Sequence, residues 1–113
     1  MNDFLQGKSQ PAIALFNHLV LSFDEIGPVS LHPAKTMIGI AAAKKFAYVI
    51  QFGKNFIDLV IPFKQRYDDN LCFHKIKPVP GSDDFNHHIR IYSKDDLNEE
   101  VRGFLKIAYD NNA

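Results

Sequence analysis

The spacing of apolar residues near the N-terminus predicts one amphipathic helix. Ser9, Gln10 and Pro11 are typical of a helix start, because a serine hydroxyl can accept a hydrogen bond from a free N–H group and proline needs no donor in the first turn. Gly27 and Pro28 end the helix, since proline cannot continue its hydrogen bonds. Between them the apolar stripe recurs at helical spacing and consists of Ala12, Phe16, Leu19, Val20 and Phe23.

After this helix, short apolar runs alternate with turn residues, which predicts a series of strands. The expected strands are Val29–His32, Thr36–Ala42, Lys45–Phe52, Asn55–Phe63, Leu71–Lys77 and His87–Tyr92. Gly53 and Lys54 form a short link that suits a hairpin. In the Lys45–Phe52 run, regular alternation places one set of side chains on one face (Phe46, Tyr48, Ile50 and Phe52) and the other set on the opposite face (Ala47, Val49 and Gln51). Both sets are fairly apolar, so this strand is expected at the centre of a sheet.

The C-terminal region predicts a second helix. Ser93 can cap it, and Asp96 three residues later completes a capping-box pattern. The buried stripe that follows consists of Leu97, Val101, Phe104, Leu105 and Ala108. The order helix, antiparallel strands, helix predicts a single α+β domain over residues 1–113, with a twisted, mostly antiparallel sheet of about five to six strands.

Charge is balanced overall but not along the chain. There are 13 lysines and arginines and 13 acids, so the net charge does not favour a general polyanion binder. Residues Ser30–Arg66 carry six cations against one acid, whereas Tyr67–Glu100 carry four cations against eight acids. A basic part of the chain is therefore followed by an acidic part.

The compartment is inferred from the cysteine content and the chain start. Cys72 is the only cysteine, which excludes an internal disulfide and fits a reducing environment. The first residues lack a basic segment followed by an apolar one, so secretion is not indicated. The longest apolar stretch, Ala12–Phe23, is too short to span a bilayer. We expect a cytoplasmic protein that does not enter the membrane.

Several segments, taken in order, resemble a family of small bacterial domains catalogued as domain of unknown function 5655. They are FLQGKS (Phe4–Ser9), KTMIGI (Lys35–Ile40), KFAYV (Lys45–Val49), CFHKI (Cys72–Ile76), HHIRI (His87–Ile91) and DDLNEEVRGFLKIAYDN (Asp95–Asn111). The resemblance implies an α+β domain that occurs alone or attached to other modules, some of them nuclease-like. It implies no established activity.

Four polar residues in these segments are the preferred candidate site: Lys35, His74, His88 and Arg90. The resemblance places Lys35 in a Lys-Thr motif, His74 in a Phe-His pair, and His88 with Arg90 in a His-x-Arg motif. Alternation along a strand puts His88 and Arg90 on the same side. Two cations and two neutral imidazoles suit a phosphate or carboxylate. We therefore expect a non-enzymatic binding or accessory module for a small anionic ligand or a protein partner, without a cofactor; the alternative is that these residues are independent surface groups.

A second hypothesis is a metal-handling protein or small enzyme that uses Cys72, His74 and His88. Cys72 and His74 are two residues apart, so a strand would direct both to one side, where His87 or His88 could supply a further ligand. A thiolate at Cys72 beside an imidazole could also act as a nucleophile. No Cys-x-x-Cys or His-Glu-x-x-His spacing accompanies these residues.

A third hypothesis is nucleic-acid binding. Cations are interleaved with rings along the basic part of the chain: Lys44, Lys45, Lys54, Lys64 and Arg66 with Phe46, Tyr48, Phe52, Phe56 and Phe63. Rings on an open sheet can stack on bases while cations bind phosphates. Ten phenylalanines must, however, fill a small core, so most of these rings are expected inside the protein.

Overall fold

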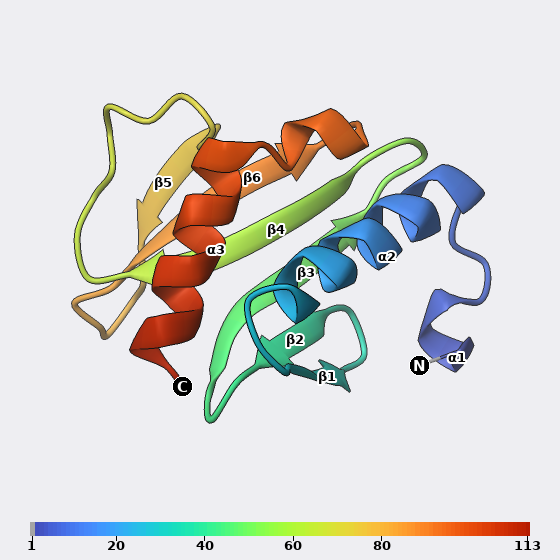
Figure 1. Ribbon diagram of the computed structural model, residues 1–113, viewed down its shortest axis with the longest axis horizontal. Helices are drawn as coiled ribbons and strands as arrows, with labels where there is room; N and C mark the ends of the chain where they lie inside the picture. The colour runs from blue at the N-terminus through green and yellow to red at the C-terminus, as the bar shows by residue number, and fades with distance from the viewer. Residues whose placement is uncertain (1) are drawn as a thin grey trace.

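The computed structural model describes residues 2–113 and places helices on one face of a six-stranded sheet (Figure 1). The strand order is β1-β2-β3-β4-β6-β5, and every neighbouring pair is antiparallel. The strands are β1 (Ser30–Pro33), β2 (Ile38–Ala41), β3 (Lys45–Phe52), β4 (Ile57–Phe63), β5 (Lys75–Pro78) and β6 (Phe85–Ile91). The helices are α1 (Asn2–Leu5), α2 (Gln10–Asp24) and α3 (Glu99–Asn111). The α+β class expected from the sequence is confirmed.

Helix α2 begins where the sequence predicts and ends at Asp24, shortly before Gly27 and Pro28. The Ser9 hydroxyl accepts a hydrogen bond from the Ala12 N–H at 3.2 Å, which satisfies a donor of the first turn. Beyond the helix, Gly27 leaves room for Tyr109 of α3, because a Cβ at this position would collide with the phenol ring. The Tyr109 hydroxyl donates a hydrogen bond to the Pro28 carbonyl at 3.0 Å. The end of α2 is thereby joined to α3.

The regular alternation expected in β3 is wrong, because its register shifts twice. Lys45 pairs with Ala41 and Ala47 pairs with Ile40, so Phe46 is an extra residue that packs against the helices together with Ala47. A second shift lies between Val49 and Gln51. Such bulges send neighbouring side chains to faces that strict alternation does not predict. Phe46 and Tyr48 therefore face opposite sides of the sheet.

The last helix starts later than Ser93. The Asp96 carboxylate accepts a hydrogen bond from the Ser93 N–H at 3.1 Å, but this local pattern produces only the 3-10 turn Lys94–Asp96. Asn98 then caps α3, and its side-chain oxygen accepts from the Val101 N–H at 3.0 Å. Strand β5 is likewise shorter than expected, since pairing begins only at Lys75.

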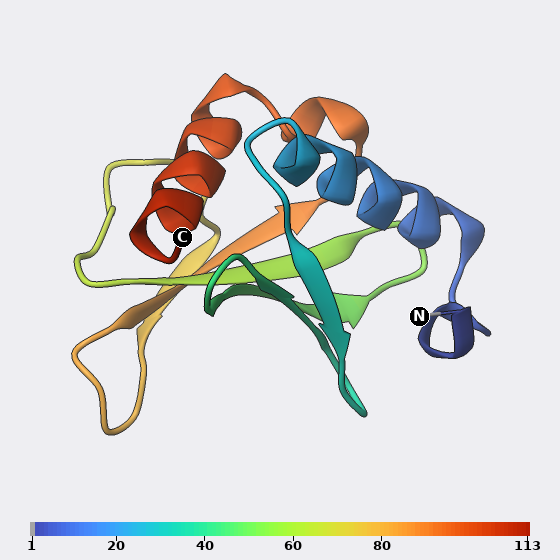
Figure 2. The ribbon, with the colours of Figure 1, turned by 60° about the horizontal axis from the view of Figure 1, so that its bottom comes forward.

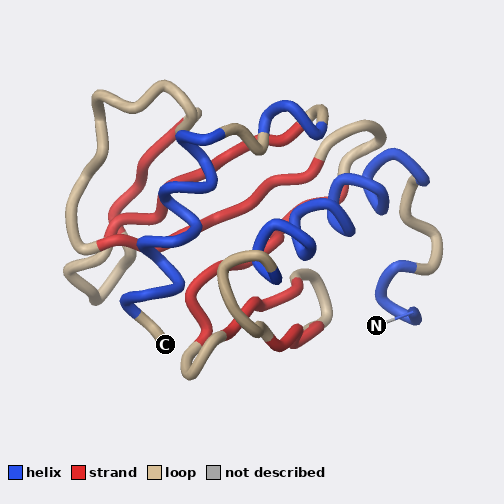
Figure 3. The backbone as a smooth tube through the Cα atoms, viewed as in Figure 1, coloured by secondary structure: helices blue, strands red, loops and turns tan. Residues whose placement is uncertain are grey.

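The two faces of the sheet differ in what covers them. Helices α2 and α3 lie over one face (Figure 3). The core between these helices and the sheet is made of aliphatic and phenylalanine side chains such as Phe16, Leu59 and Leu105. Seen from the side, the β1–β2 and β5–β6 hairpins bend away from the helices, so the other face is concave (Figure 2). None of the helices within residues 2–113 has the length and apolar character needed to cross a membrane.

Candidate functional site

The register of β6 directs alternate side chains to the core and to the open face of the sheet. His87, Ile89 and Ile91 are buried on the helix side. His88 points the other way and pairs with Val60 of β4 on one side and Lys75 of β5 on the other. Directly opposed residues of antiparallel strands share a face, so the open face combines side chains from three strands at this point.

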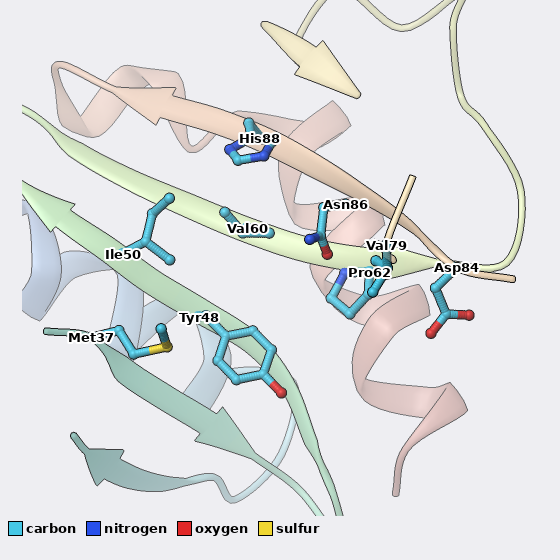
Figure 4. Close-up of a pocket in the computed structure, with 9 residues that line it drawn as sticks. All are labelled: Met37, Tyr48, Ile50, Val60, Pro62, Val79, Asp84, Asn86 and His88. Carbon is cyan, nitrogen blue, oxygen red and sulfur yellow. The ribbon is translucent and has the colours of Figure 1, made fainter. Parts of the chain in front are cut away.

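A cavity of about 440 Å³ lies on this open face. Figure 4 shows its lining, which comes from β3, β4, β6 and the segments before β2 and after β5. The lining residues are Met37, Tyr48, Ile50, Val60, Pro62, Val79, Asp84, Asn86 and His88. Most of the contact surface is apolar, and His88 and Asn86 bring polar groups along one side. An apolar cavity with few polar groups is typical of sites for organic ligands.

His88 forms a pair with His74, which precedes β5. Their ring centroids are 6.1 Å apart with perpendicular planes, and the His74 N–H donates to the His88 carbonyl at 2.9 Å. Burial, followed by the charge of Lys75, lowers the pKa of His88 to about 4. Burial and the charge of Arg90 also lower the pKa of His74. Both imidazoles are therefore neutral at pH 7, and each offers one donor and one acceptor.

Two lysines that the sequence reasoning missed complete this cluster. Lys75 pairs with His88 and Lys77 pairs with Asn86, so both lie on the open face. Neither takes part in an ion pair within residues 2–113. The sequence does contain a signal, because the Lys-Ile-Lys alternation of an edge strand directs both cations to one side. What it lacks is the register that places them beside His88.

Arg90 also lies on the open face, but it is already engaged. Its Nε and Nη2 groups donate to the two carboxylate oxygens of Asp58 at 2.8 and 3.0 Å. Its guanidinium lies over the Phe56 ring, 4.4 Å from the centroid. Hydrogen bonds to Asp58 and Tyr92 raise the pKa of Arg90 above its ordinary value. Asp58 therefore balances the positive charge of Arg90. The Arg90 side chain is held in place by this ion pair, and its charge is not left over for a ligand.

The fourth candidate, Lys35, is placed elsewhere. It is exposed in the turn between β1 and β2, at the opposite margin of the sheet from β5. Strands β3 and β4 lie between that hairpin and β6. The structure thus brings His74, His88 and Arg90 together and leaves Lys35 at the opposite edge of the sheet.

Cys72 and His74 line a further pocket, whereas His88 lines the cavity of the open face. Cys72 lies beside Glu100 of α3, and burial followed by that carboxylate raises the pKa of the thiol to about 12. The thiol is therefore protonated near neutral pH, which disfavours both metal coordination and nucleophilic attack. Within residues 2–113 no group of three histidine, cysteine or acidic side chains is arranged to hold a metal ion.

The rings of the basic segment are divided between the two faces. Phe46 and Phe63 are buried, and Phe52 packs against the same core. Phe56 is stacked with Arg90, so only Tyr48 of this set lines the cavity on the open face. The expectation that most of these rings serve the core is confirmed, and a row of stacking rings is not formed.

The fold and the site together define a class: a small α+β domain with helices on one face of an antiparallel sheet and a mainly apolar cavity, lined also by His88 and Asp84, on the open face. The chain belongs to the domain of unknown function family DUF5655, whose model matches residues 1–112. No curated protein and no solved structure matches the chain.

Proposed function

We propose that this protein is a non-enzymatic binding module whose open sheet face recognises an amphipathic anion. The carrying observation is that His88 and Asn86 line an apolar cavity, that Lys75 and Lys77 pair with them across β5 and β6, and that the His74 ring lies 6.1 Å from that of His88. These lysines and histidines are called the border of the cavity. The apolar part of the ligand would cover Val60 and its neighbours, and the anionic group would lie against the lysines.

The charges around the cavity support an anion rather than a cation. Asp84, the one charged residue in the cavity lining, is paired with Lys64 at 2.9 Å, and Arg90 is paired with Asp58. Lys75 and Lys77 have no carboxylate partner within residues 2–113. The two neutral imidazoles can donate hydrogen bonds to an oxyanion without the cost of burying a further charge. A carboxylate or sulfonate on a flat apolar body fits this combination of groups.

The test uses a pair of fluorescent probes that differ in one group. 1-Anilinonaphthalene-8-sulfonate carries the anion, and N-phenyl-1-naphthylamine has the same aromatic body without it. We expect the sulfonate to bind more tightly and to shift the NMR signals of His74 and His88. Replacing Lys75 and Lys77 together by Gln should weaken sulfonate binding by about fivefold to twentyfold and leave the neutral probe unchanged.

Lys54→Gln is the matched control, because Lys54 is an exposed lysine in the turn between β3 and β4, away from β5. Equal affinity for both probes, or equal loss in the control variant, would rule out anion recognition at this border.

The cytoplasmic location and the single-domain extent over residues 1–113 remain predictions. Fractionation of the native cells tests the location, and limited proteolysis tests the domain extent.

A further inference from the structure

A second cavity lies at the end of the sheet where β3 begins and β4 ends. Its volume is about 620 Å³, and lysines are its most frequent lining residue. Lys44 and Lys45 come from the start of β3, and Lys64 follows β4, which the antiparallel pairing brings to the same end. Asn111 and Asn112, at the end of α3, line the opposite side.

The backbone around this cavity is held in place by α3. The N–H groups of Ala43 and Lys44 both donate to the Asn112 carbonyl, at 2.9 and 3.2 Å. The stem of Lys45 lies over Gly39, since a Cβ there would come within 3.3 Å of the Lys45 Cδ. Two of the three lysines therefore extend from a backbone whose position is defined by tertiary contacts.

The positive charge in this cavity is only partly balanced. Lys64 Nζ forms an ion pair with Asp84 Oδ1 at 2.9 Å, and Asp84 is the one carboxylate among the residues that line this cavity. Lys44 and Lys45 take part in no ion pair within residues 2–113. Three lysines thus face one carboxylate. Mutual repulsion of unbalanced cations is relieved when an anion lies between them.

The two cavities are adjacent. Tyr48, Pro62 and Asp84 line both of them, so the ring of Tyr48 stands at the junction of the lysine-rich end and the apolar open face. A ligand with an anionic group among the lysines would place its organic part against Tyr48 and Pro62. Lysine is a common phosphate-binding residue because its ammonium is a compact charge with three donors.

We propose that the cavity formed by Lys44, Lys45 and Lys64 is an anion site that takes the phosphate group of a phosphomonoester, whose aromatic or apolar part packs on Tyr48. The site is distinct from the border formed by Lys75 and Lys77, and it does not depend on that border binding a ligand. The lysines also lie near the C-terminal end of α3, where cations are favourable for the helix dipole, so the test separates binding from stability.

Phenyl phosphate and inorganic phosphate are titrated into the protein at low salt and followed by amide NMR shifts. We expect shifts at residues 43–45 and 64, tighter binding of phenyl phosphate than of inorganic phosphate, and loss of this difference in Tyr48→Ala. Lys44→Gln should weaken binding about twofold to fivefold, while Lys44→Arg, which keeps the charge, should retain it. Lys54→Gln and the double Gln replacement of Lys75 and Lys77 should leave it unchanged.

Other results would overturn the proposal. They are phosphate-induced shifts that fall outside the lysine-rich cavity, or Lys44→Gln lowering the melting temperature with no change in phosphate affinity. The latter would assign the lysines to support of α3 alone. The two proposals can fail separately. If the Lys75 and Lys77 border does not bind an anion, the double Gln variant leaves sulfonate binding unchanged, whereas if this cavity does not bind phosphate, Lys44→Gln leaves phosphate binding unchanged.

Discussion

Arg90 and Asp58 form a two-point ion pair across β6 and β4, with Nε–Oδ1 and Nη2–Oδ2 distances of 2.8 and 3.0 Å. The Asp58 side chain is only 6% exposed, whereas that of Arg90 is 33% exposed. If one partner is removed, water can therefore hydrate Arg90 better than Asp58. Because it is buried, the carboxylate is the more costly charge to leave without a partner.

We expect Arg90→Leu to lower the free energy of unfolding by about 3 kcal/mol, because it leaves the Asp58 charge buried without a partner. Asp58→Asn should cost less, about 1–2 kcal/mol, since the partly exposed guanidinium can be hydrated. Urea denaturation of both variants measures the difference. The double variant with Leu at both positions should be more stable than Arg90→Leu alone, and a double variant less stable than that single one would contradict the argument.

Stability should depend on pH through His87, which is buried, and His88, which is half-buried. His87 is fully buried; its Nε2 accepts from the Tyr67 N–H and its Nδ1 donates to the Phe85 carbonyl, so the ring is held neutral. Burial lowers its pKa, and burial with Lys75 lowers that of His88 from 6.5 to about 4. Between these values the unfolded chain binds more protons than the folded one, so the free energy of unfolding falls as the pH decreases from 6.5 towards 4.

Thermal melts across that pH range measure this loss, which is absent above the unfolded pKa. His88→Gln should flatten the decline, because Gln does not titrate, while His18→Gln on the opposite side of the protein is the control. An identical pH profile for wild type and His88→Gln would show that the acid sensitivity comes from other groups.

Two glycines of the helical layer should respond to alanine in opposite directions. Gly27→Ala should destabilise the protein by about 1–3 kcal/mol, because its Cβ would displace the Tyr109 ring and weaken the hydrogen bond to Pro28. Gly103 lies inside α3 with no neighbour near the Cβ position, so Gly103→Ala should stabilise by about 0.5–1 kcal/mol. Denaturant midpoints compare the two variants directly. Destabilisation by Gly103→Ala would mean that this helix face is covered.

The thiol of Cys72 should react slowly in the folded protein. With a pKa raised to about 12 by burial and by Glu100, it supplies little thiolate at pH 8. Carbamidomethylation by iodoacetamide should be at least about tenfold slower than in urea, where burial is lost. Glu100→Gln should speed the folded-state reaction, because it removes a charge that opposes thiolate formation. Rapid labelling of the folded wild type would reopen the role of Cys72 as a metal ligand or nucleophile.

Local signals account for the parts of the fold that were predicted well. The Ser9 cap and the proline after it act within a few residues, and α2 begins where they indicate. The same reasoning failed at Ser93, because the capping pattern with Asp96 closes one 3-10 turn and Asn98 starts the helix proper. A capping pattern determines only whether the turn that follows it can form, whereas continuation of that turn into a long helix depends on tertiary packing.

The candidate site shows the same division. Alternation within one strand placed His88 and Arg90 on one side, as the register confirms. Lys35 was joined to them by the family resemblance and by the expectation of a shared face, but β3 and β4 separate its hairpin from β6. Lys75 and Lys77 were missed because their neighbours are known only once β5 is paired with β6.

The sequence by itself determined the α+β class, the order of helices and strands, and which residue types were available, because these follow from short-range periodicity and turn chemistry. Tertiary structure decided the bulges of β3, the balancing of Arg90 by Asp58, and the convergence of Lys44, Lys45 and Lys64 on one cavity. Strand pairing and its register bring together residues that are far apart in the chain, and the packing of the whole sheet against the helices determines that register. No local pattern contains that information.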